Sequence, residues 1–181
     1  MNANILNVSE KAFFDDSISH AEKHTHQPYA STTLNNNDEI RIPIQQQDLY
    51  TLPWNSLLYI EGKLLKHNNT VSVTAKLVNN AFAFLFSEIR YEIGGIVIDR
   101  VRNPGITSTM KGYVSYNTNE SKRLQNAGWS PLADNTKQII DSHGNFNVCI
   151  TLNMLLGFCE NFQKIILNLY QELILFGAVR S

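Results

Sequence analysis

The alternation of apolar and polar residues is clearest in the stretch from Phe84 to Arg102. Within it, one parity holds Ser87, Ile89, Tyr91 and Ile93, and the other holds Glu88, Arg90 and Glu92. A period of two indicates a β-strand with one buried and one solvated face. Gly94-Gly95 then allows the positive φ angles of a tight turn, and a β-branched run follows at 96–101. The pattern predicts a β-hairpin, which the breaker pair Pro104-Gly105 closes.

Weaker alternation predicts further strands on both sides of this hairpin. Asp38 to Ile44 alternates, and Pro43 places this strand at a sheet edge, or ends it there, because proline has no N–H to donate. The other predicted strands are Ser56 to Leu65 with a bulge at Gly62, Val71 to Val78, Phe146 to Ile150, Lys164 to Leu167, and Gln171 to Phe176. The chain is therefore expected to contain seven or eight strands.

Short helical segments are predicted between some of the strands. They are a short helix near Glu10 to Phe14, a turn within Asn79 to Phe86, a weak helix at 105–116, one at Thr118 to Gln125 with Thr118 as N-cap, and one at Met154 to Phe162. The segment Gly128 to Pro131 is expected to form a loop with a buried indole at Trp129. Many strands with few helices favour a mainly β fold, an antiparallel β-sandwich of the jelly-roll type with short helical insertions.

Length and composition narrow the classes of protein. A chain of 181 residues suggests one domain, with residues 1–34 as a flexible N-terminal arm and residues 35–181 as a single jelly-roll domain. The net charge of −1 gives no basic field for nucleic acid and no polybasic run for a membrane. No apolar run reaches the roughly 18 residues of a membrane span. The polar first 30 residues, with Asp15 and Asp16, do not resemble a secretory signal, so an intracellular protein is expected.

Three histidines, His20, His24 and His26, form the tightest group of possible metal ligands. On a helix, His20 and His24 would share one face, as paired zinc ligands often do. No third ligand stands at a telling spacing, so a solvated arm is the simpler interpretation. We expect no metal site.

The carboxylates Glu88, Glu92 and Asp99 lie across the predicted hairpin and raise the question of acid–base chemistry. Arginines alternate with them at Arg90, Arg100 and Arg102. Cross-strand ion pairs on a solvated or interface face therefore explain the carboxylates more simply than a catalytic pair does.

The remaining motifs carry no convincing chemistry. Cys149 lies in a predicted strand without a His or Asp at a spacing that would make it a nucleophile, so a packed thiol is expected; with Cys159 it forms no disulfide framework. Gly94-Gly95 lacks the Lys-Ser/Thr of a phosphate loop. The glycosylation patterns at Asn7, Asn68 and Asn119 are ascribed to chance. We expect no catalytic, cofactor-binding or metal-binding residues, and no enzyme activity.

Several long stretches together resemble a known family. They are NNNDEIRIPIQQQDLYTLP (35–53), SLLYIEGKL (56–64), FSEIRYEIGGIVIDRVRNPGITSTMKGYVSY (86–116), and LLGFCENFQKIIL followed by QELIL. The resemblance is to the double jelly-roll-like domain, the major-capsid-type protein of Polinton (Maverick) elements and related viruses, and it covers roughly residues 15–176.

This resemblance implies a structural role. In that family one chain holds two jelly rolls, each made of two packed four-stranded sheets, and three chains form a pseudo-hexagonal capsomer. The resemblance implies self-association through subunit contacts, without catalysis, cofactor, membrane or direct nucleic-acid binding, in a virion or inside a host cell. This sequence departs from the family in spanning about one roll, which would be the N-terminal one and would supply only half of the capsomer ring.

Two other functions stay open on the same fold. A truncated or domesticated single jelly roll would bind a protein or carbohydrate ligand, the latter on aromatics such as Tyr50, Trp54, Tyr113 and Trp129; burial of both tryptophans would exclude it. A cupin-like enzyme would need inward-facing His and carboxylate ligands, but His67 and His143 fall in predicted turns.

Overall fold

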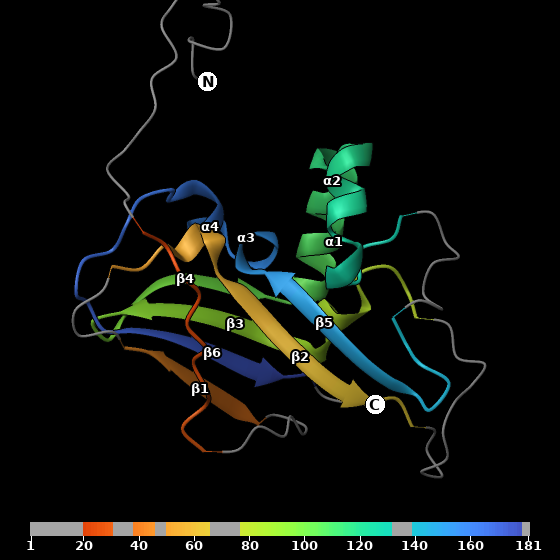
Figure 1. Cartoon of the computed structure of the whole chain (residues 1–181), viewed down its shortest axis with the longest axis horizontal. Coiled ribbons are helices and arrows are strands. Elements are labelled where there is room, and N and C mark those ends of the chain that lie inside the picture. The colour runs from red at the N-terminus through yellow and green to blue at the C-terminus, as the bar shows by residue number, and fades with distance from the viewer. Residues whose placement is uncertain (1–19, 31–37, 46–49, 66–76, 132–138, 179–181) are drawn as a thin grey trace, which may run out of the picture.

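The computed structural model describes residues 20–30, 38–45, 50–65, 77–131 and 139–178. The strands in these ranges are β1 (Glu39–Ile44), β2 (Leu57–Lys63), β3 (Phe86–Ile93), β4 (Ile96–Arg102), β5 (Asn145–Thr151) and β6 (Gln171–Gly177). They form a four-stranded sheet with the order β1-β6-β3-β4 and a two-stranded sheet of β2 and β5 (Figure 1). Every strand pair is antiparallel.

The strand pairing is nested along the chain. The first strand, β1, pairs with the last, β6, and the second strand, β2, pairs with β5, the last but one. A long antiparallel ribbon that pairs in this way and wraps around a core is the basis of a jelly roll. The predicted fold class, a mainly β antiparallel sandwich of the jelly-roll type with short helices, is confirmed.

The central hairpin forms where the alternation predicts it. β3 and β4 are joined by Gly94 and Gly95, whose φ angles of 59° and 78° are both positive. A two-residue turn with two positive φ angles matches the twist of the strands that it joins, and glycine adopts it without strain. The predicted edge position of the strand with Pro43 is also confirmed, because β1 ends the order of the larger sheet.

The core lies between the two sheets. The smaller sheet contributes Leu58, Val148 and Ile150, and the larger one contributes Ile89 and Tyr91, among other residues, to one buried cluster. The central strand β6 is buried on both faces, since Leu173 and Leu175 join this core while Ile174, which points to the opposite side, is 0% exposed. A strand that is buried on both faces shows a continuous apolar run rather than alternation.

The helices lie beside the sheets and are short. They are α1 (Pro104–Ser115), α2 (Thr118–Arg123), α3 (Leu152–Leu155) and α4 (Gly157–Asn161), with 3₁₀ turns at Pro53–Asn55, Ala81–Leu85 and Gln125–Ala127. The predicted helical segments at 79–86, 105–116 and 154–162 are thus present, the last as two helices. In Figure 1, α1 and α2 project away from the strands at one end of the molecule.

Trp129 contacts both α1 and α2 at this end of the molecule. Its predicted burial is confirmed. The indole is 1% exposed, and its Nε1–H donates a hydrogen bond of 3.2 Å to Ser121 Oγ in α2. The ring contacts Tyr113 of α1 and also Tyr116, with centroid separations of 5.2 and 5.3 Å. A single buried side chain therefore joins both helices.

Three local predictions are wrong. The N-cap of α2 is Asn117 rather than Thr118: its Oδ1 accepts from the Asn119 and Glu120 amides, and Glu120 accepts from the Asn117 amide, so the capping box begins one residue earlier. Gly62 is not a bulge but pairs regularly with Phe146, whose ring occupies the space of a Cβ. Residues 164–167 form only an isolated bridge from Ile166 to Thr51.

The described ranges contain six strands, and the predicted number of seven or eight stays a prediction, because residues 66–76 lie outside those ranges. The predicted strand at 71–78 lies almost wholly outside those ranges, and the described Leu77 and Val78 belong to no strand. The predicted helix at 10–14 also lies outside them, as does most of the predicted arm, of which residues 20–30 contain no helix or strand.

Candidate functional site

The face of the larger sheet that points away from the core, called the outer face below, carries mostly charged side chains. The strand registers align them in three rows across β1, β6, β3 and β4: Glu39, Phe176, Glu88, Arg102; then Arg41, Ile174, Arg90, Arg100; then Pro43, Glu172, Glu92, Val97. Four arginines and four glutamates face one another in these rows, so the outer face is charged but balanced.

Glu88 is the centre of the ion pairs on the outer face. Its carboxylate pairs with Arg90, with Arg100 Nη2 at 2.7 Å and with Arg102 Nε at 3.4 Å, and its side chain is 12% exposed. The hydrogen bond from Arg100 has the largest effect and, together with Arg90, lowers the pKa of Glu88 to about 2, while partial burial acts in the opposite direction. Such a carboxylate stays ionised at neutral pH and is a poor general acid or base.

We expect Glu88→Gln to lower the free energy of unfolding by about 1–2 kcal/mol at pH 7. This is less than the full pKa shift of Glu88 implies, because solvent screens the exposed arginines that pair with it. The pKa of Glu88 is lower in the folded state than its ordinary 4.5. Its contribution is therefore present above pH 4.5 and is lost as the pH falls through about 2. Urea unfolding at a series of pH values measures this.

Glu92→Gln is the matched control for this substitution. Glu92 lies on the same strand and the same face, and it forms no ion pair with any residue in the described ranges. We expect its substitution to change the free energy of unfolding by less than about 0.5 kcal/mol. An effect of Glu88→Gln that is equally large at pH 7 and pH 2 would contradict the role given to the carboxylate.

The middle of the outer face combines charge with buried apolar surface. Arg41 and Arg90 flank Ile174 in the register, and the Arg90 guanidinium lies 4.6 Å from the centre of the Phe176 ring. Arg41 Nη1 also donates to Glu172 Oε2 at 3.0 Å. Arginine stems cover apolar groups while their heads stay in water, which accounts for this arrangement.

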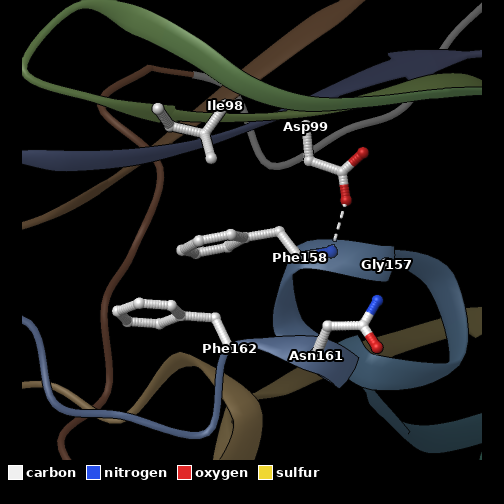
Figure 2. Close-up of a pocket in the computed structure, with 6 residues that line it drawn as sticks. All are labelled: Ile98, Asp99, Gly157, Phe158, Asn161 and Phe162. Carbon is white, nitrogen blue, oxygen red and sulfur yellow. Dashed lines mark hydrogen bonds between the residues drawn. The ribbon is translucent and has the colours of Figure 1, made fainter.

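A groove follows the outer edge of β4, on the side away from β3. One part, of about 520 Å³, is lined by Ile98 and Asp99 of β4 and by α4 residues and Phe162. The other, of about 370 Å³, continues along 100–102 and is bounded by α1 and by α3–α4. Figure 2 shows that the Phe158 and Phe162 rings point in the same direction, with Ile98 beside them. The two rings stack with centroids 5.0 Å apart.

Asp99 has a structural role in this groove. Its Oδ2 accepts a hydrogen bond of 2.8 Å from the Phe158 amide near the start of α4 (Figure 2). Glu88 and Glu92 lie on the outer face, whereas Asp99 pairs with Tyr91 and shares its side of the sheet. The three carboxylates do not converge. The prediction of cross-strand ion pairs is confirmed for Glu88 with Arg100 and Arg102 of β4, whereas its third partner, Arg90, lies on the same strand.

The other candidate ligands and nucleophiles are dispersed. Residues 20–30 form no helix, so His20 and His24 share no helix face, and both contact the carboxylate of Glu22. The described ranges hold no group of three or more His, Cys, Asp or Glu side chains suited to a metal. Cys149 is half-buried in β5, and burial raises the pKa of the Cys159 thiol to about 12, so that thiol is not a ready nucleophile.

The aromatic residues proposed for carbohydrate binding do not form a platform. Trp129 is in the core, whereas Tyr50, Trp54 and Tyr113 are exposed on different elements. Only one of the two tryptophans is buried, so this alternative is weakened but not excluded. His67 lies outside the described residues, and His143 is exposed in a turn, as predicted.

Helix α1 carries the feature that the sequence interpretation missed. The side that packs on the protein consists of small residues, Pro104, Gly105, Ser108 and Gly112. The large apolar residues are outside: Ile106 is 54% exposed, Met110 66%, Tyr113 59% and Val114 88%. Their spacing marks one helix face in the sequence, but spacing alone does not say whether that face points inward or outward.

Comparison with known families agrees with this architecture. The model of the double jelly roll-like domain matches residues 75–180, which is more than half of the chain. The chain belongs to the double jelly roll-like domain family. No curated protein and no solved structure matches it.

The double jelly roll-like match includes the β3–β4 hairpin, all four helices, β5 and β6. β1 and β2 precede it, yet they pair with β6 and β5 and so belong to the same fold. The resemblance to this family is therefore confirmed, and domains of this family are typically structural, of the capsid type. Within the ranges that the structure describes, no helix is both long and apolar enough to cross a membrane.

Proposed function

We propose that this double jelly roll-like chain is a structural capsid-type protein, akin to those of Polinton (Maverick) elements and related viruses. It associates with copies of itself through surfaces of the roll and catalyses no reaction. It acts in a virion or within the host cell that makes it. The family supports the architecture, and the exposed apolar face of α1 is the observation that supports association.

The face formed by Ile106, Met110, Tyr113 and Val114, called the α1 face below, is unusual for a surface helix. An amphipathic helix normally turns its large apolar residues toward the core. Here small residues let α1 approach Phe84 and Trp129 closely: a Cβ at Gly105 would lie 2.4 Å from the Phe84 ring, and one at Gly112 would lie 2.3 Å from the Trp129 ring. The helix is thus fixed with its apolar side outward, and contiguous exposed apolar surface marks sites of association.

A second copy of the chain is the partner that best fits the charge distribution. The net charge is −1, so copies repel one another little. The outer face has equal numbers of arginines and glutamates and presents no single-sign field for a charged ligand. In the groove along β4, Asp99 accepts a hydrogen bond from the Phe158 amide and Glu160 pairs with Lys111 at 2.6 Å, so the carboxylates of Asp99 and Glu160 are both engaged in structural contacts.

The double substitution Met110→Lys/Val114→Lys tests this proposal in sedimentation velocity over a concentration series. Both residues are exposed, so the fold should tolerate the change. Burial of two ammonium groups in an apolar contact is costly, and we expect self-association to weaken by roughly 100-fold or more.

Ser115→Lys/Asn119→Lys is the control, because it adds the same charge at exposed positions outside the α1 face. We expect this control to associate like the unaltered chain. Equal association of both variants would exclude the α1 face as a contact. An unaltered chain that stays monomeric at every concentration would exclude the proposed function itself.

A further inference from the structure

The backbone of α1 is held in place by side-chain contacts before any partner binds. Asn80 Nδ2 donates hydrogen bonds to Ser108 Oγ at 2.7 Å and to Thr109 Oγ1 at 3.0 Å. Toward α4, Lys111 Nζ pairs with Glu160 Oε2 at 2.6 Å. A helix that is already fixed loses little conformational entropy when it binds, so the α1 face is preorganised for a contact.

The largest side chain of the α1 face is fixed as well. The Tyr113 hydroxyl accepts a hydrogen bond of 3.1 Å from Asn79 Nδ2, and the Tyr113 ring packs on the Trp129 indole. A tyrosine offers a large contact area for the loss of only two side-chain torsions, and here these torsions are already restrained. The contact surface therefore exists in the free chain.

The α1 face carries no charge. Lys111 is the one charged residue of α1, and its ammonium group is engaged in the ion pair with α4. By contrast, the exposed Tyr59 of β2 donates to Glu61, and the exposed Val97 of β4 lies opposite Glu92. Because burial of an uncompensated charge is costly, the partner that fits the α1 face is itself apolar and uncharged. The same face on a second copy meets this requirement.

The spacing of the α1 face is that of a seam between paired helices. Ile106, Met110 and Tyr113 follow one another at intervals of four and three residues, and Val114 flanks them. At 3.6 residues per turn, these four side chains fall within about 100° of the helix circumference. Intervals that alternate between three and four place side chains along the line where two helices meet. Met110 lies midway between Ile106 and Val114, so this line is centred on Met110.

We infer that the α1 face pairs with the α1 face of a second copy, antiparallel, about a two-fold axis at Met110. The inference rests on the proposed function and names the surface of the partner. It goes beyond the three-chain ring that the family resemblance implies, because a two-fold contact joins chains in pairs. In this contact Met110 meets Met110 of the second copy, and Ile106 meets Val114 of the second copy.

Two features favour the antiparallel over the parallel arrangement. Antiparallel helices set the positive N-terminal end of each dipole beside the negative C-terminal end of the other, whereas parallel helices place like ends together. A parallel two-fold pair would also set Tyr113 against Tyr113 of the second copy, and neither ring can swing away, because Trp129 and Asn79 hold it. In the antiparallel pair, Tyr113 lies opposite the smaller Thr107.

The length of α1 limits the strength of the pair. Its 12 residues span about 18 Å, so a contact between two such helices falls at the small end of the range of specific interfaces. We expect copies to pair reversibly. Pairing contributes more when several contacts of an assembly act together.

Disulfide trapping between full-length chains tests whether the α1 face meets itself. Met110→Cys in a Cys149→Ser background is treated with a mild oxidant at a concentration at which the chain associates. Helix axes about 8–10 Å apart bring facing Cα atoms within disulfide range, so this single variant should form a covalent dimer. Ser115→Cys in the same background is the matched control, exposed on α1 but outside the α1 face. It should give roughly 10-fold less dimer, because its sulfur points away from the contact.

Two charge variants test the orientation. In the antiparallel pair, Ile106→Lys/Val114→Glu sets each lysine against a glutamate of the second copy, whereas Ile106→Lys/Val114→Lys sets lysine against lysine. The first variant keeps the net charge of −1 and the second has +1, so general repulsion between copies is matched. In sedimentation velocity we expect the Lys/Glu variant to associate roughly 10-fold more tightly than the Lys/Lys variant.

The outcomes separate this inference from the proposed function. Equal trapping at positions 110 and 115, in a chain that still associates, overturns the α1 pair and leaves the capsid-type function in place. Trapping at position 110 with equal association of the two charge variants overturns the antiparallel arrangement. An unaltered chain that stays monomeric at every concentration overturns the proposed function together with the inference.

Discussion

Trp129→Ala should lower the free energy of unfolding by about 3–5 kcal/mol, the largest effect expected of any single truncation discussed for this protein. The indole is fully buried against Tyr113 and Tyr116, and it is hydrogen-bonded to Ser121. Its removal leaves a cavity beneath α1, since Gly112 provides no side chain to fill the space. Urea unfolding followed by circular dichroism measures the change.

Trp54→Ala is the matched control, since the chain contains only two tryptophans and Trp54 is 39% exposed. We expect that substitution to cost less than about 1 kcal/mol. Because Trp129 holds α1 in place, Trp129→Ala should also weaken self-association, which Trp54→Ala should not. Equal losses of stability in the two variants would contradict the central position of Trp129.

Gly112→Ala should lower the free energy of unfolding by about 2–3 kcal/mol, although alanine favours a helix by about 1 kcal/mol over glycine. The added Cβ would lie 2.3 Å from the nearest Trp129 ring carbon. The ring cannot move aside freely, since Tyr113 and Tyr116 confine it. The close approach therefore outweighs the gain in helix propensity.

The sign of this effect should reverse when the indole is absent. In a Trp129→Ala background the clash disappears, and Gly112→Ala should stabilise the chain by up to about 1 kcal/mol. A double-mutant cycle measured by urea unfolding gives the coupling directly. If Gly112→Ala destabilises the chain equally in both backgrounds, the close contact with the Trp129 indole is not the reason why position 112 needs a glycine.

The central hairpin was predictable because two independent local signals agree in it. The period of two fixes which faces of β3 are buried, and Gly94-Gly95 fixes the turn. The ion pairs of Glu88 follow from the same alternation, since oppositely charged residues of one parity meet across strands. Local pattern is sufficient where neighbours in space are also neighbours in sequence.

The sequence-based predictions are wrong where the local structure depends on residues that are distant in the sequence. At Gly62 the cause is Phe146, a partner 84 positions away across the smaller sheet. The orientation of α1 depends on Trp129 and Phe84, which occupy the space beside its glycines. The capping box at Asn117 is different, because the Asn-x-x-Glu spacing was present in the sequence and Thr118 was chosen instead.

The candidate surfaces were harder to predict than the fold. The groove forms only because β4 is an edge strand and α4 lies beside it. Both features depend on the pairing of β3 with β6, which lies on the side of β3 away from β4. The apolar residues of α1 were visible at helical spacing, but a core contact is the ordinary destination of such a stripe. Only the packing of the small α1 residues against the protein shows that the large apolar residues of α1 point outward.

The mass of the purified chain in solution, measured by multi-angle light scattering over a concentration series, tests the central claim of self-association most directly. The account predicts a discrete multiple of the 20.5 kDa chain mass that grows with concentration toward a fixed value. A mass of one chain at every concentration, for a protein that is folded by circular dichroism, would contradict it.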